Sequence, residues 1–172
     1  IGKEIKTDEV MQLILKLGGY KSPGPDGLPT EFYKIHAEML ARTMKEIFNI
    51  LFKQGAIPDD MKLGVITLLY KKNDRTDVRN YRPISLLNTD MKILTKILTN
   101  RMKGVISQVI STENTGFAPS RFIGENTHEA QLLQQMAESK KTQAFFIALD
   151  IEKAFDSLSW DWLKQSLSDL GF

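Results

Sequence analysis

The chain has 172 residues, 42% of them hydrophobic, which is enough for one folded domain with a core and is not typical of disorder. It has no cysteine and only two scattered histidines, which excludes disulfides, thiolate zinc sites and histidine clusters, so any metal must be held by oxygen. No apolar run approaches the roughly 18 residues of a membrane span, and no secretory or transit pattern opens the chain, so no membrane role is expected.

The net charge of +2 conceals an uneven distribution. Residues 62–103 carry 10 basic and 3 acidic side chains, whereas 1–61 carry 8 and 9, and 104–172 carry 5 and 9. A basic block beside an acidic one suits a protein that binds a polyanion with one surface and a divalent cation with another. Two ordinarily solvated surfaces explain the same counts, and charge alone leaves that alternative open.

The first third of the chain predicts two helices separated by a shaped loop. Helical spacing begins at Asp8 and stops at two glycines, Gly18 and Gly19. Lys21–Pro29 holds three prolines and two glycines, which favour a fixed loop over a flexible linker. One long helix is then expected from Thr30 to a stop at Gly55, with this apolar face: Phe32, Ile35, Met39, Leu40, Met44, Ile47, Ile50 and Leu51. The adjacent carboxylates Asp59 and Asp60 are expected to cap or solvate a turn.

The basic block predicts a β-hairpin followed by a helix. The β-branched run 64–72 reads as a strand that ends in two lysines, and a polar turn leads into a second strand at 81–86. Pro83 keeps Arg82 on an extended backbone. Arg82 and Lys71 are therefore candidates for binding a triphosphate, although exposed hairpin cations are more often merely solvated. A helix with an apolar face and several basic residues is expected from Thr89 to Val109.

The last third predicts a loop at 112–126, a helix at about 126–138, a buried strand and a helix at about 160–170. Six apolar residues, 144–149, predict the buried strand, and Asp150 stands at its end. There the Asp150 carboxylate suits either a metal or a helix N-cap. Glu152 and Asp156 would repel it without a cation or a basic partner, for which Lys153 is a candidate.

Five motifs in order resemble the reverse transcriptases of non-LTR retrotransposons of the long interspersed element type. They span about Ser22 to Trp162 and read SPGPDGLPTEFYK, ITLLYKKND, NYRPISLLNTDMKILTKILTNRM, GFAPSR and FFIALDIEKAFD. The resemblance implies an α+β class and the right-hand polymerase fold. It makes 1–172 a partial reverse transcriptase domain, with about 1–143 mainly fingers and about 144–172 the start of the palm.

The resemblance also implies roles for particular residues. Asp150 matches the palm aspartate that binds two catalytic Mg²⁺ ions, with the main-chain carbonyl of Ile151 as a further ligand, and Phe155 matches the gate that excludes a 2′-hydroxyl. Arg82 and Lys71 match fingers residues on the incoming triphosphate. Arg121 in GFAPSR matches a template contact, and Lys72 and Arg75 are further template candidates. The sequence departs from the family before Gly116, where Glu113, Asn114 and Thr115 replace a common glutamine.

The implied activity is RNA-directed DNA synthesis, with an RNA template, a DNA primer and deoxynucleoside triphosphates as partners. The chain lacks an initiator methionine and the family's Asp-Asp palm motif, so we expect a truncated segment, inactive alone, of a polyprotein with the remaining palm, a thumb and an endonuclease. Such an enzyme is expected to act in the nucleus and the cytoplasm, although no import signal is visible in the sequence. The alternatives are a non-catalytic nucleic-acid-binding remnant, an RNA-dependent RNA polymerase and a domain with no nucleic-acid role.

Overall fold

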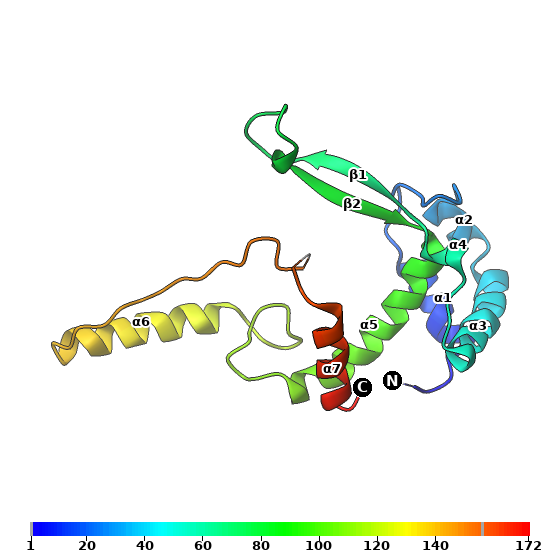
Figure 1. Cartoon of the computed structure of the whole chain (residues 1–172). Coiled ribbons are helices and arrows are strands. Elements are labelled where there is room, and N and C mark those ends of the chain that lie inside the picture. Colours follow the sequence, from blue (N-terminus) through cyan, green and yellow to red (C-terminus); the bar gives the residue numbers. More distant parts are fainter. Residues whose placement is uncertain (1, 156) are drawn as a thin grey trace. The chain divides into compact units, whose positions relative to one another are not determined.

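A two-stranded antiparallel hairpin and seven α-helices make up the regular structure of residues 2–155 and 157–172, which the computed structural model describes (Figure 1). The chain forms two units, Gly2–Arg101 and Met102–Phe172, and the boundary falls inside helix α5. The elements are α1 Thr7–Lys16, α2 Thr30–Ile35, α3 Ala37–Gln54, α4 Asp59–Lys62, β1 Gly64–Tyr70, the short 3₁₀ helix η1 Val78–Asn80, β2 Tyr81–Leu87, α5 Thr89–Val109, α6 Gly124–Ser139 and α7 Trp160–Asp169.

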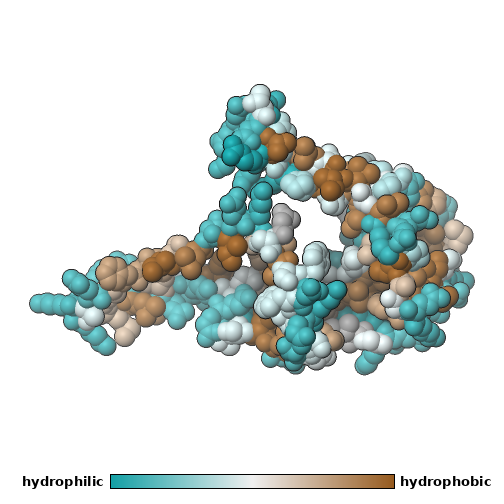
Figure 2. Space-filling view, viewed as in Figure 1, coloured by the Kyte–Doolittle hydropathy of each residue, from teal (hydrophilic) through white to brown (hydrophobic). Residues whose placement is uncertain are grey.

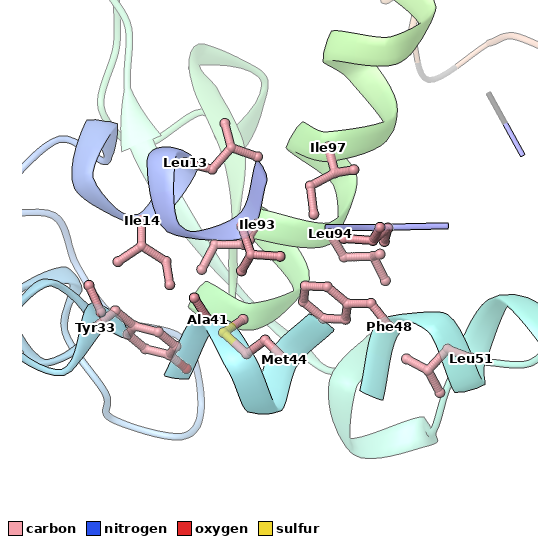
Figure 3. Close-up of a cluster of buried hydrophobic side chains, with 13 residues drawn as sticks. Leu13, Ile14, Tyr33, Ala41, Met44, Phe48, Leu51, Ile93, Leu94 and Ile97 are labelled. Carbon is pink, nitrogen blue, oxygen red and sulfur yellow. The ribbon is translucent and has the colours of Figure 1, made fainter. Parts of the chain in front are cut away.

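The first unit has one hydrophobic core, built by α1, α2, α3 and the N-terminal half of α5 (Figure 3). Phe48 of α3 lies at its centre with Ile14 of α1 and Ile93 of α5, each at most 1% exposed. The remaining buried apolar residues are Ile5, Val10, Leu13, Tyr33, Ala37, Ala41, Met44, Leu51, Leu94 and Ile97. The predicted helices α1 and α5 are confirmed, but the core uses only the first half of α5, since Val105 and Val109 are each 38% exposed.

The prediction of one long helix over 30–54 is wrong, because the helix is interrupted at His36. His36 has φ −103° and ψ 23°, outside the helical range, and separates α2 from α3. Tyr33 before the interruption and the small residue Ala37 after it are both buried in the core. Much of the predicted apolar face is exposed instead, at Ile35, Met39, Ile47 and Ile50. The predicted stop at Gly55 is confirmed by its left-handed φ of 66°.

The proline loop at 21–29 is fixed to the start of α5. The Asp26 amide donates to Asn88 Oδ1 at 3.2 Å, and Thr89 Oγ1 donates to the Leu28 carbonyl at 3.4 Å. A side chain at Gly24 would stand within 2.4 Å of the Asn88 backbone nitrogen, so only glycine fits there. The predicted shaped loop is therefore confirmed, and it supports the residue that directly follows β2.

Buried hydrogen bonds attach the segment before α1 to α3. The Ile5 amide donates to Asn49 Oδ1 at 2.8 Å, and Asn49 Nδ2 donates back to the Ile5 carbonyl at 3.0 Å. The Asn49 side chain thus satisfies both polar groups of one buried backbone residue, which would otherwise cost free energy.

Burial, together with the carboxylates of Asp90 and Asp26, raises the pKa of Tyr33 in the same unit to about 12.

The second unit contains α6 and α7, which confirm the two predicted helices, but no strand forms over 144–149. Residues 142–150 have no regular structure, and their side chains are exposed, Phe145 by 90% and Leu149 by 89%. A strand needs a hydrogen-bonded neighbour, and among the described residues β1 pairs only with β2. The predicted buried strand is thus wrong here, because the described residues supply it with neither a partner strand nor a covering layer. No helix in the described part of the chain is long and apolar enough to cross a membrane.

Candidate functional site

The predicted hairpin is confirmed, and its register places the two predicted triphosphate-binding residues on one face. Leu69 lies opposite Arg82, and the Lys71 amide donates to the Asn80 carbonyl at 2.9 Å, which extends the ladder past Tyr70. Side chains alternate between faces, so Lys71 and Arg82 share a face as diagonal neighbours. Diagonal neighbours lie about 7–8 Å apart at the backbone, within reach of one polyphosphate for two long cations.

The turn between the strands, residues 71–80, is ordered by aromatic and polar contacts. The Tyr70 and Tyr81 rings pack edge to face with centroids 5.6 Å apart, and the Arg75 guanidinium lies 4.9 Å from the centroid of the Tyr70 ring. The Tyr81 hydroxyl donates to the Arg75 carbonyl at 2.9 Å, and Asn80 Nδ2 donates to the Asp74 carbonyl at 2.8 Å. The turn therefore presents its cations from a fixed backbone.

The cations of the hairpin differ in whether a carboxylate already neutralises them. Arg79 is paired with Asp77 at 2.8 Å, and this pair holds the Asp77 pKa below its usual range. Lys71, Lys72 and Arg82 are exposed and form no ion pair with any residue that the structure describes. The hairpin is also apolar along its strands and hydrophilic at its tip (Figure 2). This combination suits a ligand that carries both phosphates and flat apolar groups.

Arg121, the predicted template contact, is engaged within its own unit. Its guanidinium donates to the carbonyls of Asn114 at 2.7 Å, Ile110 at 3.1 Å and Ser107 at 3.2 Å, and also to that of Ser111. These carbonyls lie at the end of α5 and in the following turn, where helices leave acceptors unsatisfied. Arg121 therefore closes the end of α5 and shapes the GFAPSR loop, a role that sequence reasoning missed because it depends on side-chain direction.

Asp150 lies on an exposed, irregular stretch. It caps no helix, since residues 152–155 form a turn and α7 is capped by Ser159, whose Oγ accepts from the Trp162 amide at 3.3 Å. Ile151 is 71% exposed and Phe155 is 94% exposed. Asp156 lies outside the described residues, and Lys153 forms no ion pair with a described carboxylate.

The described residues do not assemble a metal-binding cluster at Asp150. Over residues 2–155 and 157–172, no three acidic, histidine or cysteine side chains gather in a way that could hold a metal. The two other predicted carboxylates, Asp59 and Asp60, open the short helix α4, where Lys62 pairs with Asp59 at 2.8 Å. The expectation that this pair is solvated is confirmed, whereas the expected capping is not, because Pro58 is the N-cap residue and no side chain caps the helix.

A comparison of the sequence with known families identifies the family of the chain. Residues 70–172, from the end of β1 to the last residue, match the family described as reverse transcriptase (RNA-dependent DNA polymerase), and the chain belongs to this family. Its relatives include the RNA-directed DNA polymerase of the mobile element jockey from Drosophila melanogaster, 30% identical over 88% of this chain. They also include the transposon TX1 uncharacterized 149 kDa protein from Xenopus laevis, 34% identical over 98% of it.

A third relative is the Pol polyprotein of the type-1 retrotransposable element R1 from Bradysia coprophila, 26% identical over 91% of this chain. These relatives are elements of the non-LTR type, which confirms the resemblance drawn from the five motifs. The chain spans only 13% of the TX1 protein, 17% of the jockey polymerase and 16% of the R1 polyprotein. The activity of a whole enzyme is therefore a matter for proposal.

Proposed function

We propose that this chain supplies the fingers and the first part of the palm of an RNA-directed DNA polymerase that extends a DNA primer on an RNA template. About 1–143 would be mainly fingers, and about 144–172 would begin the palm. The observation that carries the proposal is the hairpin of a reverse transcriptase family member, with the unneutralised cations Lys71 and Arg82 on one face. Two cations so placed suit the triphosphate of an incoming deoxynucleotide.

Asp150 and Ile151 are the proposed metal ligands. The Asp150 carboxylate and the Ile151 carbonyl are oxygen donors of the kind that Mg²⁺ prefers, and both residues are exposed. Two bound Mg²⁺ ions would neutralise charge on the triphosphate during transfer to the primer hydroxyl. Two donors are too few for such a site, and the described residues form no cluster that supplies the others. The remaining ligands would therefore come from other parts of the complete polymerase.

The remaining residues are assigned to sugar and template. Phe155 would pack under the sugar of the incoming nucleotide and exclude a 2′-hydroxyl. Lys72 and Arg75, in the ordered turn, would contact template phosphates or bases. Arg121 uses its terminal nitrogens on carbonyls, so we propose that it serves the template mainly by fixing the GFAPSR loop.

The triphosphate assignment is tested in a complete polymerase that contains this chain. Arg82→Gln is expected to raise the KM for deoxynucleotides about tenfold or more, because a charge-assisted hydrogen bond contributes about 1.5–3 kcal/mol. Steady-state primer extension on an RNA template measures it. Arg79→Gln is the matched control, since Asp77 already neutralises that arginine, and its KM should change by less than about twofold. Equal effects of the two substitutions would contradict the assignment.

The sugar assignment predicts that Phe155→Ala weakens discrimination against ribonucleotides. Removing the ring leaves space for a 2′-hydroxyl, and steric selection of this kind is worth about 1–3 kcal/mol, or tenfold and more. The ratio of kcat/KM for a deoxynucleotide to that for its ribonucleotide is the measurement. Leu158→Ala, three residues further on, is the control and should leave the ratio unchanged. An unchanged ratio in Phe155→Ala would contradict the assignment of Phe155 as the residue that excludes a 2′-hydroxyl.

One observation favours a second function, RNA binding without polymerisation. The described residues present the cationic hairpin fully formed but contain no group of three or more side chains that could hold a metal. The 172-residue chain alone would then bind RNA without sequence preference and with strong salt dependence, and it would extend no primer. Gel-shift titration of the 172-residue chain measures this binding. Primer extension by a complete polymerase that contains the chain distinguishes the two functions, because the second function predicts RNA binding without extension there as well.

A further inference from the structure

Tyr20 is a fully exposed aromatic residue on a left-handed backbone. It lies in the loop between α1 and α2 (Figure 1), is 100% exposed and has a φ of 54°. Side chains with a Cβ atom avoid this conformation, which glycine adopts freely. The chain has two glycines immediately before this position and yet places tyrosine at the left-handed residue. Stability of the loop therefore does not explain the choice of residue.

The unusual backbone of Tyr20 is held by a specific contact. The Tyr20 amide donates to Glu31 Oε1 at 2.7 Å, and this bond keeps the pKa of the Glu31 carboxyl below its usual value. A Cβ atom at Gly19 would approach the same carboxylate oxygen to 3.2 Å, so the loop fits closely around Glu31. The contact anchors the loop to the first turn of α2.

The ring itself contributes no packing to the described chain, which leaves both of its faces open to a ligand. An observed backbone outlier of this kind is a reasonable pointer to function. The exposed cation Lys21 follows directly, and its aliphatic part lies 3.4 Å from the position of a Cβ on Gly18. A flat ring beside a cation matches a nucleotide of a single strand, whose base stacks and whose phosphate is anionic.

A second exposed aromatic residue on a left-handed backbone lies in the other unit. Phe117 also follows a glycine, has a φ of 58° and is fully exposed. It belongs to the GFAPSR loop that Arg121 holds in shape. Two independently ordered loops thus each present one aromatic ring on a left-handed residue, which makes a chance exposure of Tyr20 a poorer explanation.

We propose that Tyr20 is a base-stacking contact for single-stranded RNA, presented by the Glu31-anchored loop with Lys21 on the adjacent phosphate. This contact rests on the proposed nucleic-acid function and adds a residue outside the motifs and outside the basic block 62–103. Stacking accepts any base, so the contact would hold the strand without reading its sequence.

The test uses the 172-residue chain and a 12-nucleotide uridine RNA with one central 2-aminopurine. Tyr20→Leu is expected to weaken the Kd about fivefold to tenfold, the lower part of the range for loss of one stacked base, and to reduce quenching of the 2-aminopurine. Tyr20→Phe should keep both. Phe52→Leu, an exposed aromatic on ordinary helical backbone in α3, is the matched control and should bind as the unsubstituted chain does.

Salt separates stacking from charge and from misfolding. The Kd ratio of Tyr20→Leu to the unsubstituted chain should stay constant between 50 and 200 mM NaCl, whereas a Lys71→Gln, Lys72→Gln double variant should approach the unsubstituted chain as salt rises. Thermal unfolding should be unchanged in Tyr20→Leu. If the unsubstituted chain binds RNA and Tyr20→Leu binds it equally, the stacking contact is overturned and the hairpin proposal stands. If the unsubstituted chain does not bind, both proposals are overturned.

Discussion

Replacing Asp150 by asparagine is expected to lower primer extension at least about 1,000-fold in a complete polymerase that contains this chain. Asparagine keeps the size of the side chain but removes the negative charge of its oxygen ligand. Charge neutralisation by metal ions contributes several kcal/mol to reactions at phosphate, and about 4 kcal/mol corresponds to three factors of ten in rate. Single-turnover extension on a preformed RNA template and DNA primer duplex measures the chemical step.

The exposure of Asp150 makes this substitution a clean test of chemistry. Asp150 stands on an exposed stretch and caps no helix. Asp150→Asn should therefore leave the unfolding temperature unchanged and the affinity for template RNA within about twofold of that of the parent. Asp161→Asn is the control, because Asp161 is an exposed carboxylate in the first turn of α7. Residual extension above a tenth of the parent rate, or a matching loss of RNA affinity, would contradict the role of Asp150 as a metal ligand in the chemical step.

The elements that could be predicted from the sequence are those whose interactions are local. The helices α1, α5, α6 and α7 follow from spacing at 3.6 residues, and the hairpin follows from two β-branched runs around a polar turn. The placement of Lys71 and Arg82 on one face of the hairpin also follows from strand alternation once the register is known. These features need only residues that lie near one another in the chain.

The failures share one cause, because each depended on a distant partner. Residues 144–149 have the composition of a buried strand, but composition supplies neither the neighbouring strand nor the covering layers. The buried face of α2 and α3 was mispredicted because the small residues Ala37 and Ala41 enter the core, whereas the larger residues Ile35 and Met39, which had been assigned to that face, are exposed. Hydrophobicity ranks residues by size, but close packing of α3 against α1 selects small ones.

The site shows the same division. The basic character of the hairpin can be predicted from its composition. The neutralisation of Arg79 by Asp77 and the hydrogen bonds from Arg121 to backbone carbonyls depend instead on side-chain geometry. Counting charge therefore overestimated the number of cations available to a ligand. The unpaired residues Lys71, Lys72 and Arg82 are the better basis for experiments.

Arg101→Met is expected to destabilise the chain by about 2–3 kcal/mol. Arg101 donates two hydrogen bonds to the carboxylate of Glu9, at 2.9 and 2.7 Å, and further bonds to the carbonyls of Lys3 and Glu4. The pair is largely screened from water, with side chains 15% and 29% exposed, and hydrogen bonds to charged groups contribute about 1.5–3 kcal/mol. Methionine keeps the length and apolar part of the side chain, so the loss isolates the polar contacts. Urea unfolding of the 172-residue chain is the measurement.

An exposed pair and the pH dependence together identify the source of this stability. Arg42→Met breaks the pair with Glu38, whose side chains are 70% and 75% exposed, and should cost less than about 0.5 kcal/mol. The hydrogen bond from Arg101 holds the pKa of the Glu9 carboxyl below its usual value, although partial burial opposes this. A lowered carboxyl pKa contributes stability that is present above the unfolded pKa and lost as pH falls through the folded one. The difference between parent and Arg101→Met should therefore be full at pH 7 and shrink below about pH 4, the usual range of a glutamate. A difference that does not change with pH would assign the loss to packing.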